Sequence, residues 1–73
     1  MKRLNELQPG ATGIISVVNA TQHIAQQLMV MGLLPGVHLE VVGVAPFGDP
    51  MTIRVKGRSV SLRRADASLV ELE

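Results

Sequence analysis

The chain has 73 residues, no cysteine, a formal net charge of +1 and a single aromatic residue, Phe47. Its length predicts one domain, 1–73, and without thiols the fold must rest on the packing of aliphatic side chains. The balanced charge argues against nucleic acid as a partner, and one aromatic ring cannot build the stacking surface that single-stranded nucleic acids or proline-rich peptides require.

The start of the chain does not have the pattern of a signal sequence, because the basic pair Lys2-Arg3 is not followed by an apolar run. Leu4 and Leu7 lie three residues apart before Pro9 and fit one short helical turn. No stretch approaches the roughly 20 apolar residues that span a bilayer. We therefore expect a soluble, cytoplasmic protein that does not insert into a membrane, and the lack of cysteine fits a reducing cytosol.

Residues 13–18 are rich in β-branched side chains and too few for a typical helix, so they predict the first strand. The pattern leaves its inward face open. Ile15 with Val17 and Ile14 with Val18 are the two alternatives, and a bulge in the strand would mix the two sets.

A helix is predicted to run from a cap at Asn19 or Thr21 to about Met31. The apolar positions with helical spacing form a narrow inward seam: Ile24, Leu28 and Met31. Met29 and Val30 lie off this seam. Two interpretations of this pair remain open, contact with neighbouring loops or part of a surface that binds a partner.

The helix is followed by a corner in which Gly32 can end the helix in the left-handed conformation and Pro35-Gly36 suits a type II turn. So short a bend cannot easily bury both Leu33 and Leu34. We expect one of them to anchor the corner to the core and the other to contact a partner. The expected partner-contact residues are Met29, Val30, Leu33 and Leu34.

After the corner, residues 38–45 alternate and predict a strand with Leu39 and Val41 inward, interrupted at Gly43 by a bulge or bend. Residues 46–50 contain two prolines and a glycine and predict a loop, which Asp49 is expected to brace by bonding amides nearby.

The clearest hairpin spans 51–63, with its turn at Gly57-Arg58. A single helical turn over 64–67 and a closing strand over 70–72 follow, and the last strand is expected to pair with the first. Five short strands with one helix inserted between strands 1 and 2 predict an all-β fold, a small and partly open five-stranded barrel.

The sequence gives no reason to expect an enzyme. Its serines have no histidine placed to activate them, and the phosphate-binding loop of nucleotide hydrolases is missing. His23 and His38 are far apart and fall short of the three or more ligands of a typical zinc or iron site, so we expect no metal site and no cofactor. Four arginines are candidates by type alone for facing a partner's GTPase site, with surface solubility as the alternative: Arg54, Arg58, Arg63 and Arg64.

Four motifs in order resemble the ferrous iron transport protein A (FeoA) family. They lie at 7–10 (Leu-Gln-Pro-Gly), 28–36 (ending Met-Gly-Leu-Leu-Pro-Gly), 45–50 and 62–67, and together cover nearly the whole chain. The resemblance implies an SH3-like barrel. It also implies a small accessory or regulatory protein of bacterial ferrous iron uptake that docks on FeoB, a permease with a cytosolic GTPase region, and is recruited by it to the inner face of the membrane.

The family offers no catalytic residues to transfer, and it leaves open whether such a protein stimulates, inhibits or assembles the transporter. A second resemblance gives the alternative function. The C-terminal SH3-like module of metal-dependent repressors looks similar, which would make this chain a metal-sensing or DNA-linked regulatory module.

Overall fold

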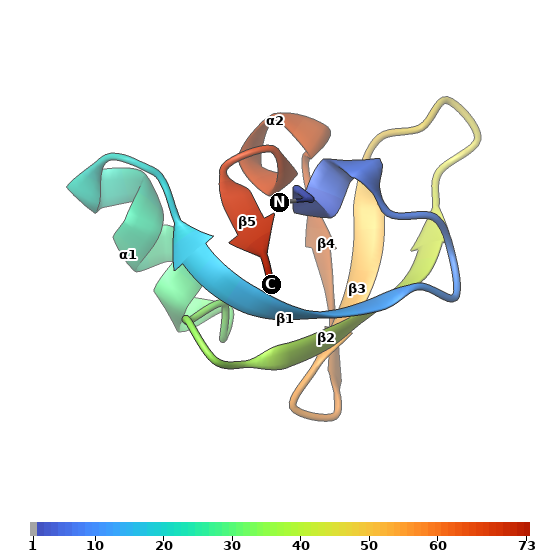
Figure 1. Ribbon diagram of the computed structural model, residues 1–73. Coiled ribbons are helices and arrows are strands. Elements are labelled where there is room, and N and C mark those ends of the chain that lie inside the picture. Colours follow the sequence, from blue (N-terminus) through green and yellow to red (C-terminus); the bar gives the residue numbers. More distant parts are fainter. Residues whose placement is uncertain (1) are drawn as a thin grey trace.

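The computed structural model describes residues 2–73 and contains one curled antiparallel sheet with an α-helix at one end (Figure 1). In chain order the elements are η1 Leu4–Glu6, β1 Thr12–Val18, α1 Gln22–Val30, β2 His38–Val44, β3 Met51–Val55, β4 Arg58–Leu62, α2 Arg64–Ala67 and β5 Val70–Leu72. The sheet order in this part of the chain is β4-β3-β2-β1-β5. The predicted partly open five-stranded barrel, with its helix between the first and second strands, is confirmed.

Two bulges curl the sheet. The pairing of β1 with β5 changes register between Ile15 and Val17, and the pairing of β2 with β3 changes register between Val41 and Gly43. At the first bulge Ile15 is fully buried whereas Val17 is 42% exposed, so the bulge mixes the two alternative faces of the strand. β1 therefore pairs with β2 along its first half and with β5 along its second half.

The core is aliphatic and draws on every element. Its buried side chains are Leu4, Leu7, Ile15, Leu28, Leu33, Leu39, Val41, Met51, Ile53, Val55, Leu62, Ala67, Val70 and Leu72. The expected short turn at the start of the chain is the 3-10 helix η1, which brings Leu4 into this core. The alternation predicted for the hairpin is also present, because Met51, Ile53 and Val55 all point inward.

The helix α1 is capped by Thr21, whose hydroxyl accepts a hydrogen bond from the backbone amide of Ile24 at 3.4 Å. Asn19, the other expected cap, instead donates its backbone N–H to the carbonyl of Leu69 at 2.7 Å. This hydrogen bond holds the segment that precedes the helix. Within α1 only Leu28 is buried, while Ile24 and the following Met31 are partly buried against the core. The predicted seam is present and narrow.

The corner after α1 ends the helix by a Schellman arrangement. The amide of Gly32 donates to the carbonyl of Met29, and the amide of Leu33 donates to the carbonyl of Leu28, each at 2.9 Å. Gly32 is left-handed with φ +96°. The amide of Val37 then donates to the carbonyl of Leu34 at 3.1 Å across Pro35-Gly36, as expected for a type II turn.

Substitution of Gly32 by alanine is expected to lower the free energy of unfolding by about 1–2 kcal/mol, because a β-carbon disfavours the left-handed conformation. That β-carbon would also lie 3.3 Å from Cγ1 of Val55. Gly43→Ala is the matched control, since its φ is not left-handed and nothing lies within 4 Å of its added β-carbon. Urea denaturation checks both, and equal losses would contradict the assignment of Gly32 as an obligatory helix stop.

The other end of the barrel is fastened by Arg64. Its Nε donates to the carbonyl of Gly48 and its Nη1 donates to the carbonyl of Asn5 at 2.6 Å. The amide of Arg64 in turn donates to Oδ1 of Asp49 at 3.0 Å. The expectation that Asp49 braces its own loop is corrected, because its carboxylate caps the first turn of α2 and so joins two distant segments.

Candidate functional site

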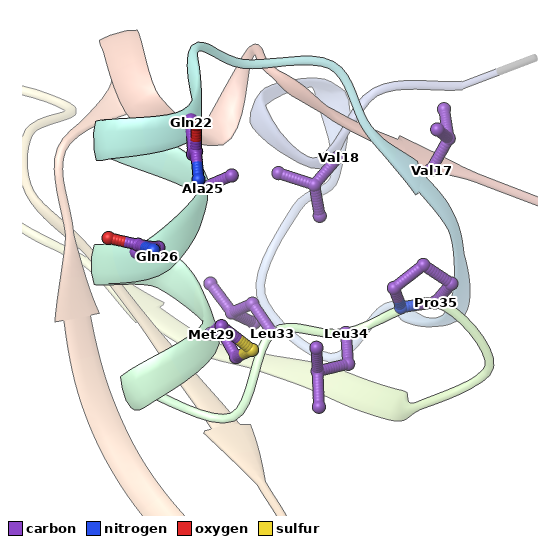
Figure 2. A pocket seen from close by; sticks show the side chains of 9 residues that line it. All are labelled: Val17, Val18, Gln22, Ala25, Gln26, Met29, Leu33, Leu34 and Pro35. Carbon is purple, nitrogen blue, oxygen red and sulfur yellow. The ribbon is translucent and has the colours of Figure 1, made fainter.

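An apolar groove of about 420 Å³ lies between α1, the end of β1 and the corner. Figure 2 shows α1 along one side, with its side chains facing those of β1 across the opening. The groove is lined by Val17, Val18, Gln22, Ala25, Gln26, Met29, Leu33, Leu34 and Pro35. It exists because α1 buries only its narrow seam and leaves its next face uncovered.

Three of the four expected contact residues meet in this groove. Leu33 is 1% exposed and forms its floor, whereas Met29 is 46% exposed and Leu34 is half-buried. Val30 is 80% exposed and does not line the groove. The expectation that the corner carries one leucine inward and leaves the other accessible is met, with Leu33 as the core residue.

A second, smaller hollow of about 230 Å³ continues the groove past the C-terminal end of α1. It shares Met29 and Leu34 with the groove, so the two form one surface. The hollow is lined by Met29, Val30, Met31, Gly32, Leu34, Val55, Lys56 and Arg58. The apolar surface thus ends at two basic side chains, Lys56 on the turn between β3 and β4 and Arg58 at the start of β4.

Some residues of this surface were not expected from the sequence. Val17 and Val18, the two residues of β1 that follow its bulge, both line the groove. The signal for the bulge was the competition between two inward faces in residues 13–18, which a regular strand does not show. Lys56 was missed because its place depends on how the hairpin turn packs beside the corner.

The four candidate arginines do not form one site. Arg58 adjoins the second hollow, whereas Arg54 lies 3.5 Å from Oε1 of Glu40 in an ion pair on another face. Arg63 follows the far end of β4, about 16 Å from Arg58 at 3.3 Å per strand residue. Arg64 is engaged with the carbonyls of Gly48 and Asn5, which gives its guanidinium a structural role.

The remaining chemistry is sparse in the part of the chain that the structure describes. No group of three or more histidine, cysteine, aspartate or glutamate side chains there is arranged to hold a metal ion. His23 lies on α1 and His38 at the start of β2, so the fold places them on different elements. None of the described helices has the length and apolar character needed to cross a membrane.

Comparisons with known proteins connect this architecture to one family. The FeoA domain model matches residues 2–73. A curated relative from Porphyromonas gingivalis, a fusion of Fe(2+) transport protein A with the Fe(2+) transporter FeoB, is 37% identical over 71 residues, which is 97% of this chain and 8% of the fusion protein. The chain therefore corresponds to a small part of that relative.

Solved structures agree with this match. Iron(II) transport protein A from Clostridium thermocellum has a TM-score of 0.94 and 35% identity, covering 99% of this chain and 44% of that one. FeoA from Stenotrophomonas maltophilia, solved with zinc and described as a prokaryotic SH3 domain protein, has a TM-score of 0.85 and 25% identity, covering 100% and 91%.

A manganese-dependent transcriptional repressor shares the fold as well, with a TM-score of 0.85 and 17% identity, covering 94% of this chain and 39% of that chain. IdeR from T. acidophilum has a TM-score of 0.86 and 28% identity, covering 97% of this chain and 32% of that chain. The repressor resemblance seen in the sequence thus extends to the structure of this module. The family model, however, spans all of residues 2–73, and the resemblance to FeoA is confirmed. The chain belongs to the FeoA domain family and has its SH3-like fold.

Proposed function

We propose that this protein is a small accessory or regulatory protein of bacterial ferrous iron uptake, and that it docks on the cytosolic GTPase region of a FeoB-type permease. The observation that carries the proposal is the P. gingivalis fusion, in which a sequence 37% identical to this chain shares one polypeptide with an Fe(2+) transporter. Fusion keeps two modules at high effective concentration, which is useful when they act on each other.

The groove is the surface that suits such docking. Its floor is the buried Leu33, and the side chains of Met29 and Leu34 are accessible beside it. The polar side chains of Gln22 and Gln26 also line it, so the groove has the apolar centre and polar edge of a protein interface. The protein would work in the cytoplasm and reach the inner face of the membrane through its partner. Its effect would come from binding, because the sequence offers no catalytic side chains. Among the four candidate arginines, Arg58 alone adjoins the docking surface.

Pull-down of the purified protein with the transporter's cytosolic region, and separately with the full-length transporter, tests the proposal. Binding is expected at tens of micromolar or tighter. Met29→Ser should weaken it about tenfold, because a buried methionine side chain contributes roughly 1.5–3 kcal/mol to an apolar contact. Lack of binding by the wild type to both forms of the transporter would overturn the proposal.

Val42→Ser is the matched control for Met29→Ser. Val42 is 41% exposed, close to the 46% of Met29, but it lies on β2 and lines neither hollow. The control variant should therefore bind the transporter as the wild type does. Equal losses from the two substitutions would place the docking face elsewhere on the protein.

The alternative function is a metal-sensing or DNA-linked regulatory module, favoured by the likeness to IdeR. Anaerobic titration with iron(II) or manganese(II), followed by NMR of the histidine rings, separates the two. Stoichiometric binding with shifts at His23 or His38 would favour the regulatory module, whereas unchanged spectra would favour docking.

A further inference from the structure

The groove and the second hollow are free of acidic residues. The chain has six: Glu6, Glu40, Asp49, Asp66, Glu71 and Glu73. None of them lines either hollow, and α1 itself carries no carboxylate and no lysine or arginine. The only charged side chains along this surface, Lys56 and Arg58, lie together at one end. The surface is therefore apolar along α1 and positive beyond its C-terminal end.

The two positive charges have no partner within the described chain. The single ion pair found in residues 2–73 joins Arg54 to Glu40, and Lys56 and Arg58 are both exposed. Both cations line the second hollow, and an anionic group bound in that hollow would be attracted to each of them. This end of the surface is thus complementary to a carboxylate.

Lys56 occupies its position against the preference of the backbone. It has φ +52°, and no other residue except glycine among residues 2–73 has a positive φ. With Gly57 it forms a two-residue turn of type I′, where asparagine, aspartate or glycine is favoured. A lysine at this point carries a conformational cost, and within residues 2–73 its side chain makes no hydrogen bond or ion pair that would offset it, as expected of a side chain that serves a partner.

From these observations we infer that the surface binds an acidic, apolar peptide segment of a partner protein. The segment places two or three aliphatic side chains in the groove and its carboxylates against Lys56 and Arg58. The nine residues of α1 set the length of the groove at about 13 Å, which fits two to three turns of a helix. At the opposite end, Gln22 and Gln26 offer amides in place of charges. The inference specifies what the proposed function's docking surface binds, and it rests on the proposed function only for the identity of the partner protein.

A pair of synthetic peptides tests the inference without the transporter. Both carry the same leucines at helical spacing, and the remaining positions are glutamate in one peptide and lysine in the other. The acidic peptide is expected to shift the amide NMR signals of Met29, Leu34 and Lys56 and to bind about tenfold more tightly at low salt than the basic peptide, with the difference shrinking as salt is raised. Equal binding, or shifts confined to other faces, would overturn the inference.

Two variants at the opposite ends of one strand give the second test. Arg58→Glu and Arg63→Glu make the same change of charge at opposite ends of β4, and only Arg58 adjoins the surface. Arg58→Glu should lower the affinity for the acidic peptide and for the transporter's cytosolic region about fivefold or more. Arg63→Glu should change neither affinity by more than about twofold. Similar effects of both variants would contradict a local carboxylate contact.

The outcomes separate this inference from the proposed function. If the acidic peptide binds and the transporter does not, the inference stands and the proposed partner is wrong. If the transporter binds and Arg58→Glu has no effect, the proposed function stands and the inference is wrong. Binding to vesicles of anionic phospholipid but not to the acidic peptide, or a concentration-dependent dimer in sedimentation that Arg58→Glu dissociates, would replace the peptide segment by a lipid surface or by a second copy.

Discussion

Replacing Arg64 with alanine is expected to lower the free energy of unfolding by about 3 kcal/mol, because it removes two hydrogen bonds from a charged donor to backbone carbonyls, each worth roughly 1.5–3 kcal/mol. The carbonyls belong to Gly48, in the loop before β3, and to Asn5 in η1. One side chain therefore joins three segments that are distant in sequence. The substitution should loosen the loop and η1 together, and urea denaturation measures the total loss.

Arg63→Ala provides the control for that experiment. Arg63 is adjacent in sequence and exposed, and its side chain does not cap α2, so its loss should cost less than about 0.5 kcal/mol. Arg64→Lys should recover only part of the stability, since an ammonium group cannot reproduce the planar fork that reaches both carbonyls. Equal stability of the alanine variants at 63 and 64 would show that these hydrogen bonds contribute nothing.

The local features of the fold were predictable because each depends on a few adjacent residues. Gly32 and Pro35-Gly36 fix the corner by backbone conformation, and the alternation of Met51, Ile53 and Val55 fixes the inward face of β3. A short stretch of sequence is therefore enough to predict each of these features.

The features that depend on distant segments were not predictable in the same way. Nothing near Asp49 in the sequence indicates that its carboxylate caps α2, because Arg64 lies fifteen residues away. The groove and the second hollow have the same origin, since the fold brings Val17 of β1 beside α1 and Lys56 of the hairpin turn beside the corner. The sequence predicted that one of Leu33 and Leu34 anchors the corner to the core and that the other contacts a partner, but it could not say which leucine is buried.

The structure assigns the buried role to Leu33, and this assignment leads to the largest expected effect. Leu33→Ser should lower the free energy of unfolding by about 4 kcal/mol, the sum of lost burial, a cavity and a hydroxyl left in an apolar core. Leu33 is 1% exposed, and its amide also closes the end of α1. The free energy of unfolding of a protein of this length is roughly 4–11 kcal/mol, so the loss removes a large part of it and the variant should be largely destabilised at physiological temperature.

Leu34→Ser should cost only about 1 kcal/mol, because this side chain is half-buried at the edge of the groove. Its effect should appear instead in docking, as a loss of about tenfold in affinity for the transporter's cytosolic region. Urea denaturation and the pull-down, run on both variants, divide the two roles. If Leu34→Ser loses as much stability as Leu33→Ser and still binds the transporter's cytosolic region as the wild type does, the corner has only a structural role. The docking face must then lie away from the groove.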